Sequence, residues 1–226
     1  MSFDRVAPHY RWLETLVFGN QLQQARVAFV REIEAPLRIL IVGEGNGRFL
    51  TELMRTGEPR VDCVEMSVRM IALARKQVPD AHVNFIEADV RDLSLCQAHY
   101  DLIVSHFFFD CFTEGALAEI IARLANAAAP DAQWLIADFC YPPRGWHHWR
   151  ARALIAAMYF FFRAAAGIEA RRLVDYSPLL WANGFRLRKE LLSRRGEIRS
   201  QLWQRRVPGF AQEDAAPTDC GASRSE

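Results

Sequence analysis

Between residues 37 and 139, five short apolar segments are separated by more polar segments, several of which have apolar residues at helical spacing. Apolar runs at 37–42, 61–65, 83–87, 100–105 and 134–139 predict strands, and the helices are expected at 47–56, 67–77 and 113–128, with Pro130 as the stop of the last one. Such an alternation is typical of an open, mostly parallel sheet with helices on both faces. In these sheets ligands bind beyond the carboxyl ends of the strands, so the functional residues are expected there.

The segments on either side of this region complete the predicted organisation. Apolar positions at helical spacing in residues 4–33, interrupted at Gly19-Asn20, predict two helices within an N-terminal section of residues 1–36. After residue 139 the pattern predicts helices at 146–166 and 175–182, then a hairpin of strands 185–192 and 197–206. Residues 207–226 are small, polar and proline-containing, which predicts a disordered tail after a main domain of residues 37–206.

Three glycines, Gly43, Gly45 and Gly47, follow the first predicted strand in the stretch LRILIVGEGNGRFLT. Without a Cβ atom the chain turns tightly and a ligand can approach the main chain, while the next helix directs free N–H groups toward it. A phosphate-binding loop is excluded because Arg48 and Phe49 stand where Lys and Ser or Thr are needed. A dinucleotide-binding loop is disfavoured because its third glycine would fall one position later.

Polar residues at the next strand ends narrow the choice of ligand. Glu65 ends the second strand, where its carboxylate could accept hydrogen bonds from both hydroxyls of a ribose. Met66 could cover one face of an adenine ring. After the third strand, Asp89 could accept the adenine amino group, and the main chain at Val90 could meet the ring edge.

With these motifs, residues 37–206 resemble the class I S-adenosylmethionine-dependent methyltransferases, small-molecule branch. The N-terminal FDRVAPHYRWLE is similar to the lid helix of ubiquinone/menaquinone C-methyltransferases. The resemblance implies an α/β, three-layer Rossmann-like fold with a seven-stranded sheet, one strand antiparallel, and N-terminal lid helices. It also implies S-adenosyl-L-methionine as cofactor and S-adenosyl-L-homocysteine as product, bound by Gly43, Gly45, Gly47, Glu65 and Asp89, with a further contact from Tyr10.

The sequence departs from this family at Ile41, where an acidic residue usually stands two positions before the first glycine. We therefore expect Glu44 to contact the ammonium group of the cofactor instead.

The methyl acceptor is expected beside the fourth strand end, in SHFFFDCF. His106 is the candidate for a catalytic base or a substrate hydrogen bond. The alternative is a partly buried histidine that contacts the cofactor or only its own backbone. Asp110 is expected to cap the next helix, and Phe107–Phe109 to lie mostly in the core. Aromatic residues in the N-terminal section and in residues 146–162 favour an apolar or aromatic acceptor, such as a quinone or lipid-like molecule.

Other partners are disfavoured. The Asn/Asp-Pro-Pro-Tyr/Phe motif of amino-methylating enzymes is absent after the fourth strand, and the net charge is only +1, so nucleic acid is not expected. Five scattered cysteines and no zinc-type spacing predict no metal site and reduced thiols. The most lipid-like stretch, ALIAAMYFFF, is too short to cross a bilayer, so at most a membrane-surface contact stays open.

The sequence thus predicts a cytoplasmic S-adenosylmethionine-dependent methyltransferase that transfers a methyl group to O, C or N of a small molecule by in-line displacement. Two alternatives stay open: a non-catalytic S-adenosylmethionine-binding scaffold or regulator, and a nicotinamide-dependent oxidoreductase. The N-terminal charges predict no secretory signal.

Overall fold

The structure, a computed structural model, describes residues 18–33, 38–78, 83–142 and 145–206. Most of the predicted lid region, with Tyr10, lies outside the described residues, as does the predicted tail.

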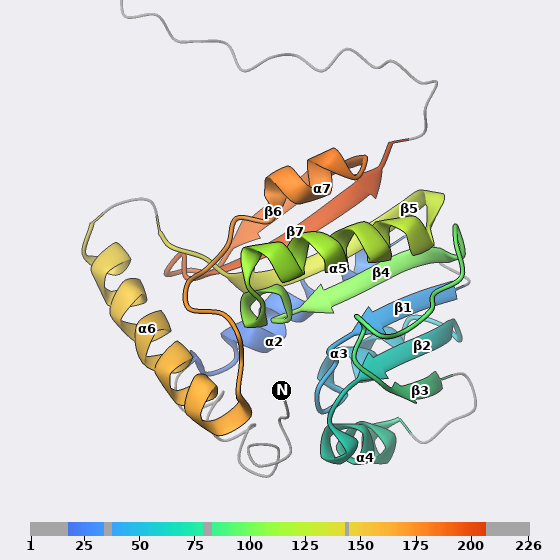
Figure 1. Cartoon of the computed structure of the whole chain (residues 1–226), viewed down its shortest axis with the longest axis horizontal. Coiled ribbons are helices and arrows are strands. Elements are labelled where there is room, and N and C mark those ends of the chain that lie inside the picture. Colours follow the sequence, from blue (N-terminus) through green and yellow to red (C-terminus); the bar gives the residue numbers. More distant parts are fainter. Residues whose placement is uncertain (1–17, 34–37, 79–82, 143–144, 207–226) are drawn as a thin grey trace, which may run out of the picture.

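Seven strands in the described part of the chain form one sheet in the order β3-β2-β1-β4-β5-β7-β6 (Figure 1). The strands are β1 (Arg38–Val42), β2 (Arg60–Glu65), β3 (Val83–Glu87), β4 (Tyr100–His106), β5 (Ala128–Phe139), β6 (Phe185–Leu192) and β7 (Ile198–Arg205). β1 pairs in parallel with both β2 and β4, whereas β7 runs antiparallel between β5 and β6. The predicted seven-stranded sheet with one antiparallel strand is confirmed.

Helices connect these strands close to the predicted positions. They are α2 (Gln21–Val27), α3 (Arg48–Leu53), α4 (Val68–Gln77), α5 (Glu114–Ala127), α6 (Trp146–Ala166) and α7 (Ser177–Ala182), with short 3-10 helices η1 (Val30–Glu32) and η2 (Phe109–Cys111). α3 ends three residues earlier than predicted because Thr56 donates from its N–H and its hydroxyl to the Leu53 carbonyl, at 2.9 and 2.7 Å. Ser67 caps α4 as expected, since its hydroxyl accepts the Met70 N–H at 3.2 Å.

The predicted boundary between α5 and β5 is wrong. Pro130 does not stop the helix, which already ends at Ala127, and instead lies in the first part of β5. The pairing of β4 with β5 shifts register between Tyr100 and Leu102, and Pro130 is exposed at this irregular end. A proline without an N–H is tolerated where the ladder is interrupted.

Both faces of the sheet are covered, which explains the continuous apolar run in β1. Ile39 and Ile41 pack against Phe49 and Leu50 of α3, while Leu40 and Val42 belong to the larger core formed with α5 on the other face. These alternate side chains of β1 are at most 1% exposed. The core therefore holds β1 and its glycine turn in a fixed place.

The strand order reverses between β1 and β4, so a crevice opens beyond the carboxyl ends of these two strands. α6 lies beyond the same strand ends, whereas α5 covers one face of the sheet (Figure 1). Among the helices of the described residues, none combines the length and apolarity needed to cross a membrane.

Candidate functional site

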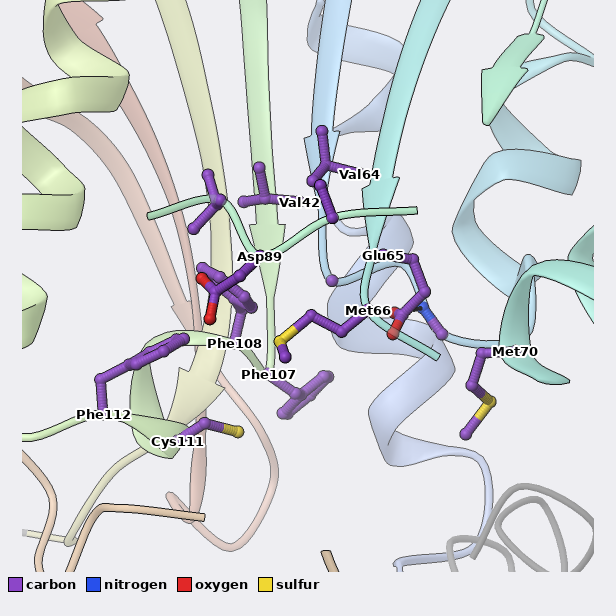
Figure 2. Close-up of a pocket in the computed structure, with 14 residues that line it drawn as sticks. Val42, Val64, Glu65, Met66, Met70, Asp89, Phe107, Phe108, Cys111 and Phe112 are labelled. Atoms are coloured by element: carbon purple, nitrogen blue, oxygen red, sulfur yellow. Dashed lines mark hydrogen bonds between the residues drawn. The ribbon is translucent and has the colours of Figure 1, made fainter. Parts of the chain in front are cut away.

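A pocket lies at the carboxyl ends of β1, β2 and β4 and encloses about 680 Å³ of empty space, part of it open to solvent. Figure 2 shows Glu65 and Met70 on one side of it and Cys111 and Phe112 on the other. The residues that line it are Val42, Gly43, Gly45, Val64, Glu65, Met66, Met70, Ala88, Asp89, Val90, Phe107, Phe108, Cys111 and Phe112. Six of the predicted cofactor-binding residues are thus brought together: Gly43, Gly45, Glu65, Met66, Asp89 and Val90.

The first two glycines form part of one wall of the pocket. At Gly43 a neighbouring side chain leaves no room for a Cβ atom. A Cβ atom at Gly43 would overlap the ring of Phe108, whereas at Gly45 it would meet nothing within 4 Å. The Gly43 N–H donates to the Val64 carbonyl at 2.9 Å, which ties the turn to the end of β2. The bare backbone lets the Phe108 ring and a ligand both lie against this loop.

Gly47 does not line the pocket and has a different role. Its φ of 85° is left-handed, and a Cβ atom there would lie 2.8 Å from the Cα of Ala74 in α4. This glycine therefore allows α3 to pack closely against α4. The predicted contact of Gly47 with the cofactor stays a prediction.

Glu65 joins the glycine turn to the start of α4. Its Oε2 accepts the Gly45 N–H at 3.1 Å, and its Oε1 accepts the Ser67 N–H at 2.9 Å. The side chain is only 9% exposed and ends at the pocket wall. The carboxylate is therefore held in one orientation, and its predicted contact with a ribose stays a prediction.

Asp89 follows β3 and is held by Arg91, which the sequence did not single out. The Arg91 guanidinium donates to both carboxylate oxygens of Asp89, at 2.6 to 3.0 Å, and to Glu169 Oε1 at 2.9 Å. These hydrogen bonds lower the pKa of Asp89, so it is ionised at neutral pH. Arg91 also lies over the ring of the lining residue Phe112, at 5.6 Å, and so connects two walls of the pocket.

Glu44 is turned away from the lining residues and caps α3. Its Oε1 accepts the N–H groups of Phe49 and Leu50 at 2.9 and 3.0 Å, where the glycine at the N-cap has no side chain to do so. Burial raises the pKa of Glu44 to about 7, against the opposing effect of these hydrogen bonds. The expected contact with the cofactor's ammonium group stays a prediction, and the contacts present assign Glu44 to the helix terminus.

Glu44→Gln is expected to stabilise the protein at pH 8 but not at pH 5. Because the pKa of Glu44 is about 7 when folded and 4.5 as a free group, folding takes up a proton between these values and stability falls as pH rises. Glutamine keeps an oxygen acceptor for both N–H groups without the charge. Urea unfolding should show a gain of about 1 to 3 kcal/mol at pH 8 and little change at pH 5. Glu44→Ala, as control, should lose stability at pH 5 and be less stable than Glu44→Gln at both pH values, because it lacks the acceptor for the two N–H groups. An equal Glu44→Gln effect at both pH values would contradict the assignment.

His106, the predicted catalytic residue, points away from the pocket. It is 8% exposed, and its ring meets that of Phe49 of α3 edge-on, with centroids 4.6 Å apart. Burial, together with the charge of Arg26, lowers the pKa of His106 to about 3, so the imidazole is neutral. The ring is therefore packed inside the protein among the described residues, and the catalytic role of His106 stays a prediction.

The chain bends sharply just after His106. Phe107 has a φ of 53°, uncommon for a bulky residue, and this turn brings Phe107 and Phe108 into the pocket wall. The buried Arg26 of α2 lies over the Phe107 ring at 4.9 Å. The three consecutive phenylalanines were visible in the sequence as aromatic residues beside the fourth strand end. No sequence signal indicated that Arg26 is buried, since an arginine on an amphipathic helix usually faces solvent.

Asp110 does not cap α5 as expected. The N-cap of α5 is Thr113, without a side-chain cap hydrogen bond, and Asp110 lies one turn earlier in η2. Its Oδ1 instead accepts from the thiol of Cys111 at 3.6 Å.

Comparison with known proteins finds a family match in one part of the chain. Residues 39–131 match a family described as "Methyltransferase domain". A malonyl-[acyl-carrier protein] O-methyltransferase of Anoxybacillus flavithermus is 31% identical over 125 residues, which cover 54% of this chain and 47% of that protein. The match therefore spans less than half the length of this relative.

Two solved structures share the fold. An S-adenosylmethionine-dependent methyltransferase from Mesorhizobium loti is 20% identical, with a TM-score of 0.62 over 81% of this chain and all of the other. The magnesium protoporphyrin IX methyltransferase of Synechocystis PCC 6803, solved with bound S-adenosylhomocysteine, is 16% identical, with a TM-score of 0.65 over 90% of this chain and 97% of the other.

Proposed function

We propose that this chain, which matches a methyltransferase-domain family over residues 39–131, is a class I S-adenosylmethionine-dependent methyltransferase that transfers a methyl group from S-adenosylmethionine to a small molecule. The observation that carries the proposal is the meeting of three strand-end features in one pocket. These are the glycine turn after β1, Glu65 at the end of β2 and Asp89 after β3.

The residues present fit the cofactor. Gly43 and Gly45 present a main chain without side chains, against which the methionine part would lie. The fixed carboxylate of Glu65 would accept the ribose hydroxyls, Met66 would cover the adenine, and Asp89 would accept its amino group. When bound, the cofactor supplies an electrophilic methyl group on a positively charged sulfur.

The chain's own residues mainly position the reactants and exclude water, as an in-line displacement requires. Phe107, Phe108 and Phe112 give the pocket an aromatic wall. Such a wall favours an acceptor with an apolar or aromatic part. The relatives' names, a malonyl-[acyl-carrier protein] and a porphyrin methyltransferase, support a small or carrier-bound acceptor with polar oxygen groups.

Calorimetry with S-adenosylmethionine, S-adenosylhomocysteine and NADH tests the cofactor. We expect saturable binding of both sulfur nucleotides with micromolar or lower dissociation constants and none of NADH. Methyl transfer from radiolabelled S-adenosylmethionine to a panel of phenols, enols and carboxylic acids then tests the activity. Binding of NADH alone would contradict the proposal, and cofactor binding without any transfer would favour the non-catalytic alternative.

A further inference from the structure

Two acidic residues and a tyrosine lie beside the pocket: Asp138 and Tyr159 are buried, and Asp110 is partly buried. Asp110 belongs to η2 after β4, Asp138 is the penultimate residue of β5, and Tyr159 lies on the buried side of α6. They come from three elements at the carboxyl edge of the sheet, where α6 lies beyond the strand ends (Figure 1).

Two of these side chains have polar atoms that the fold does not satisfy. Asp138 is 2% exposed; its Oδ1 accepts the Phe139 N–H at 2.8 Å, but its Oδ2 has no hydrogen-bond partner among the described residues. Tyr159 is 7% exposed, and its hydroxyl also has none there. A buried polar atom left unpaired costs about 1 to 3 kcal/mol, so a ligand that pairs these two atoms would remove that cost.

The two carboxyl groups influence each other's ionisation. Burial and the neighbouring Asp110 raise the pKa of Asp138 well above its usual value, and burial raises the pKa of Asp110 to about 6. Two adjacent carboxyl groups avoid being ionised together, so Asp138 and Asp110 share one proton. Tyr159 lies close enough that both carboxyl groups contribute, after burial, to a raised pKa of its hydroxyl.

The group adjoins the cofactor pocket through Cys111. This residue lines the pocket, and its thiol donates to Asp110 at 3.6 Å (Figure 2 shows its sulfur directed into the pocket). A molecule that reaches Asp110 and Tyr159 would therefore lie next to the proposed cofactor.

We propose that Asp110, Asp138 and Tyr159 form the subsite for the methyl acceptor and bind a phenolic or enolic hydroxyl group. Tyr159 and the protonated Asp138 donate to its oxygen, and the Asp110 carboxylate accepts its proton. A tyrosine and a neutral aspartic acid that donate to one oxygen, with a second carboxylate as base, form an established arrangement for stabilising an oxyanion.

The inference rests on the proposed function and accounts for the proton that the acceptor hydroxyl loses. The hydroxyl O–H bond breaks and the proton passes to Asp110. The oxygen, or the carbon conjugated with it, forms a bond to the methyl group, and the methyl–sulfur bond breaks with its electron pair left on sulfur. Tyr159 and Asp138 stabilise the negative charge that develops on the oxygen between these events.

The test uses 4-nitrophenol, whose ionised form absorbs visible light, titrated into the full chain saturated with S-adenosylhomocysteine. We expect saturable binding with the absorbance of the phenolate. Tyr159→Phe should weaken it about tenfold or more, the effect of one lost hydrogen bond. Asp110→Asn should abolish the phenolate absorbance, because the base is gone.

Controls separate this result from a folding defect. Tyr100→Phe removes a hydroxyl at the opposite end of β4, where it donates to Asp62 at 2.7 Å, and should leave nitrophenol binding unchanged. S-adenosylhomocysteine affinity should stay within about twofold in Tyr159→Phe. No saturable binding of 4-nitrophenol, or equal binding by wild type and Tyr159→Phe, would overturn the inference.

A different result would contradict the proposed function, namely that S-adenosylhomocysteine does not bind to the wild type. The nitrophenol titration is then made without it, and its dependence on Tyr159 still decides whether the subsite exists.

Discussion

Replacing Glu65 with alanine is expected to lower the affinity for S-adenosylhomocysteine at least about a hundredfold, which corresponds to about 2.7 kcal/mol. The carboxylate would accept two ribose hydroxyls, and a hydrogen bond to a charged group contributes about 1.5 to 3 kcal/mol. The substitution also removes the acceptor of the Gly45 and Ser67 N–H groups, so the glycine turn loses its link to α4. Calorimetry on wild type and variant measures the change.

Glu87 offers a matched control for this experiment. It ends β3 directly beside Glu65 in the sheet register, but it is exposed and does not line the pocket. Glu87→Ala should therefore bind S-adenosylhomocysteine like the wild type. If the Glu65 and Glu87 variants lost affinity equally, the effect would be one of general charge, and the assignment of Glu65 to the ribose would be wrong.

Thermal unfolding of both variants without ligand identifies a loss caused by structure alone. Glu65→Gln is informative here, because one carbonyl oxygen can still accept an N–H group while the charge is gone. We expect it to unfold close to the wild-type temperature and to bind more weakly than wild type but more tightly than Glu65→Ala.

The fold and six of the residues that line the pocket could be predicted from the sequence, because both depend on local patterns. Strand ends in a parallel sheet meet at one edge, so Gly43, Glu65 and Asp89 could be brought together without knowing any tertiary contact. The predicted fold is confirmed by the solved neighbours, and residues 39–131 match a family described as "Methyltransferase domain".

The rest could not be predicted because it depends on contacts between distant segments. Arg91 pairs with Glu169, 78 positions away, and the charges of Asp110 and Asp138 reach Tyr159 on α6 from two other elements of the fold. His106 was the chemically obvious residue after β4, yet the sharp bend at Phe107 directs the following side chains, and not the imidazole, into the pocket. Side-chain direction at a strand end follows from backbone angles that residue type does not reveal.

Gly47→Ala is expected to lower the free energy of unfolding by about 2 to 5 kcal/mol. A left-handed φ of 85° costs an alanine about 1 to 2 kcal/mol, and forcing a methyl group into a filled contact adds about 1 to 3 kcal/mol. The contact is with the Cα of Ala74 at 2.8 Å, a backbone atom, so it cannot be relieved by a side-chain rotation or by truncating residue 74 to glycine. Urea unfolding at neutral pH measures the loss.

Gly45→Ala separates the two contributions to this loss. Gly45 has a similar left-handed φ of 69°, but a Cβ atom there would meet nothing within 4 Å, so only the backbone strain of about 1 to 2 kcal/mol is expected. The excess loss in Gly47→Ala then measures the packing of α3 against α4. Equal losses in the two variants would mean that α3 can shift away from α4 at no cost. In that case Gly47 would be required for its backbone angle, and a direct contact with the cofactor would again have to be tested.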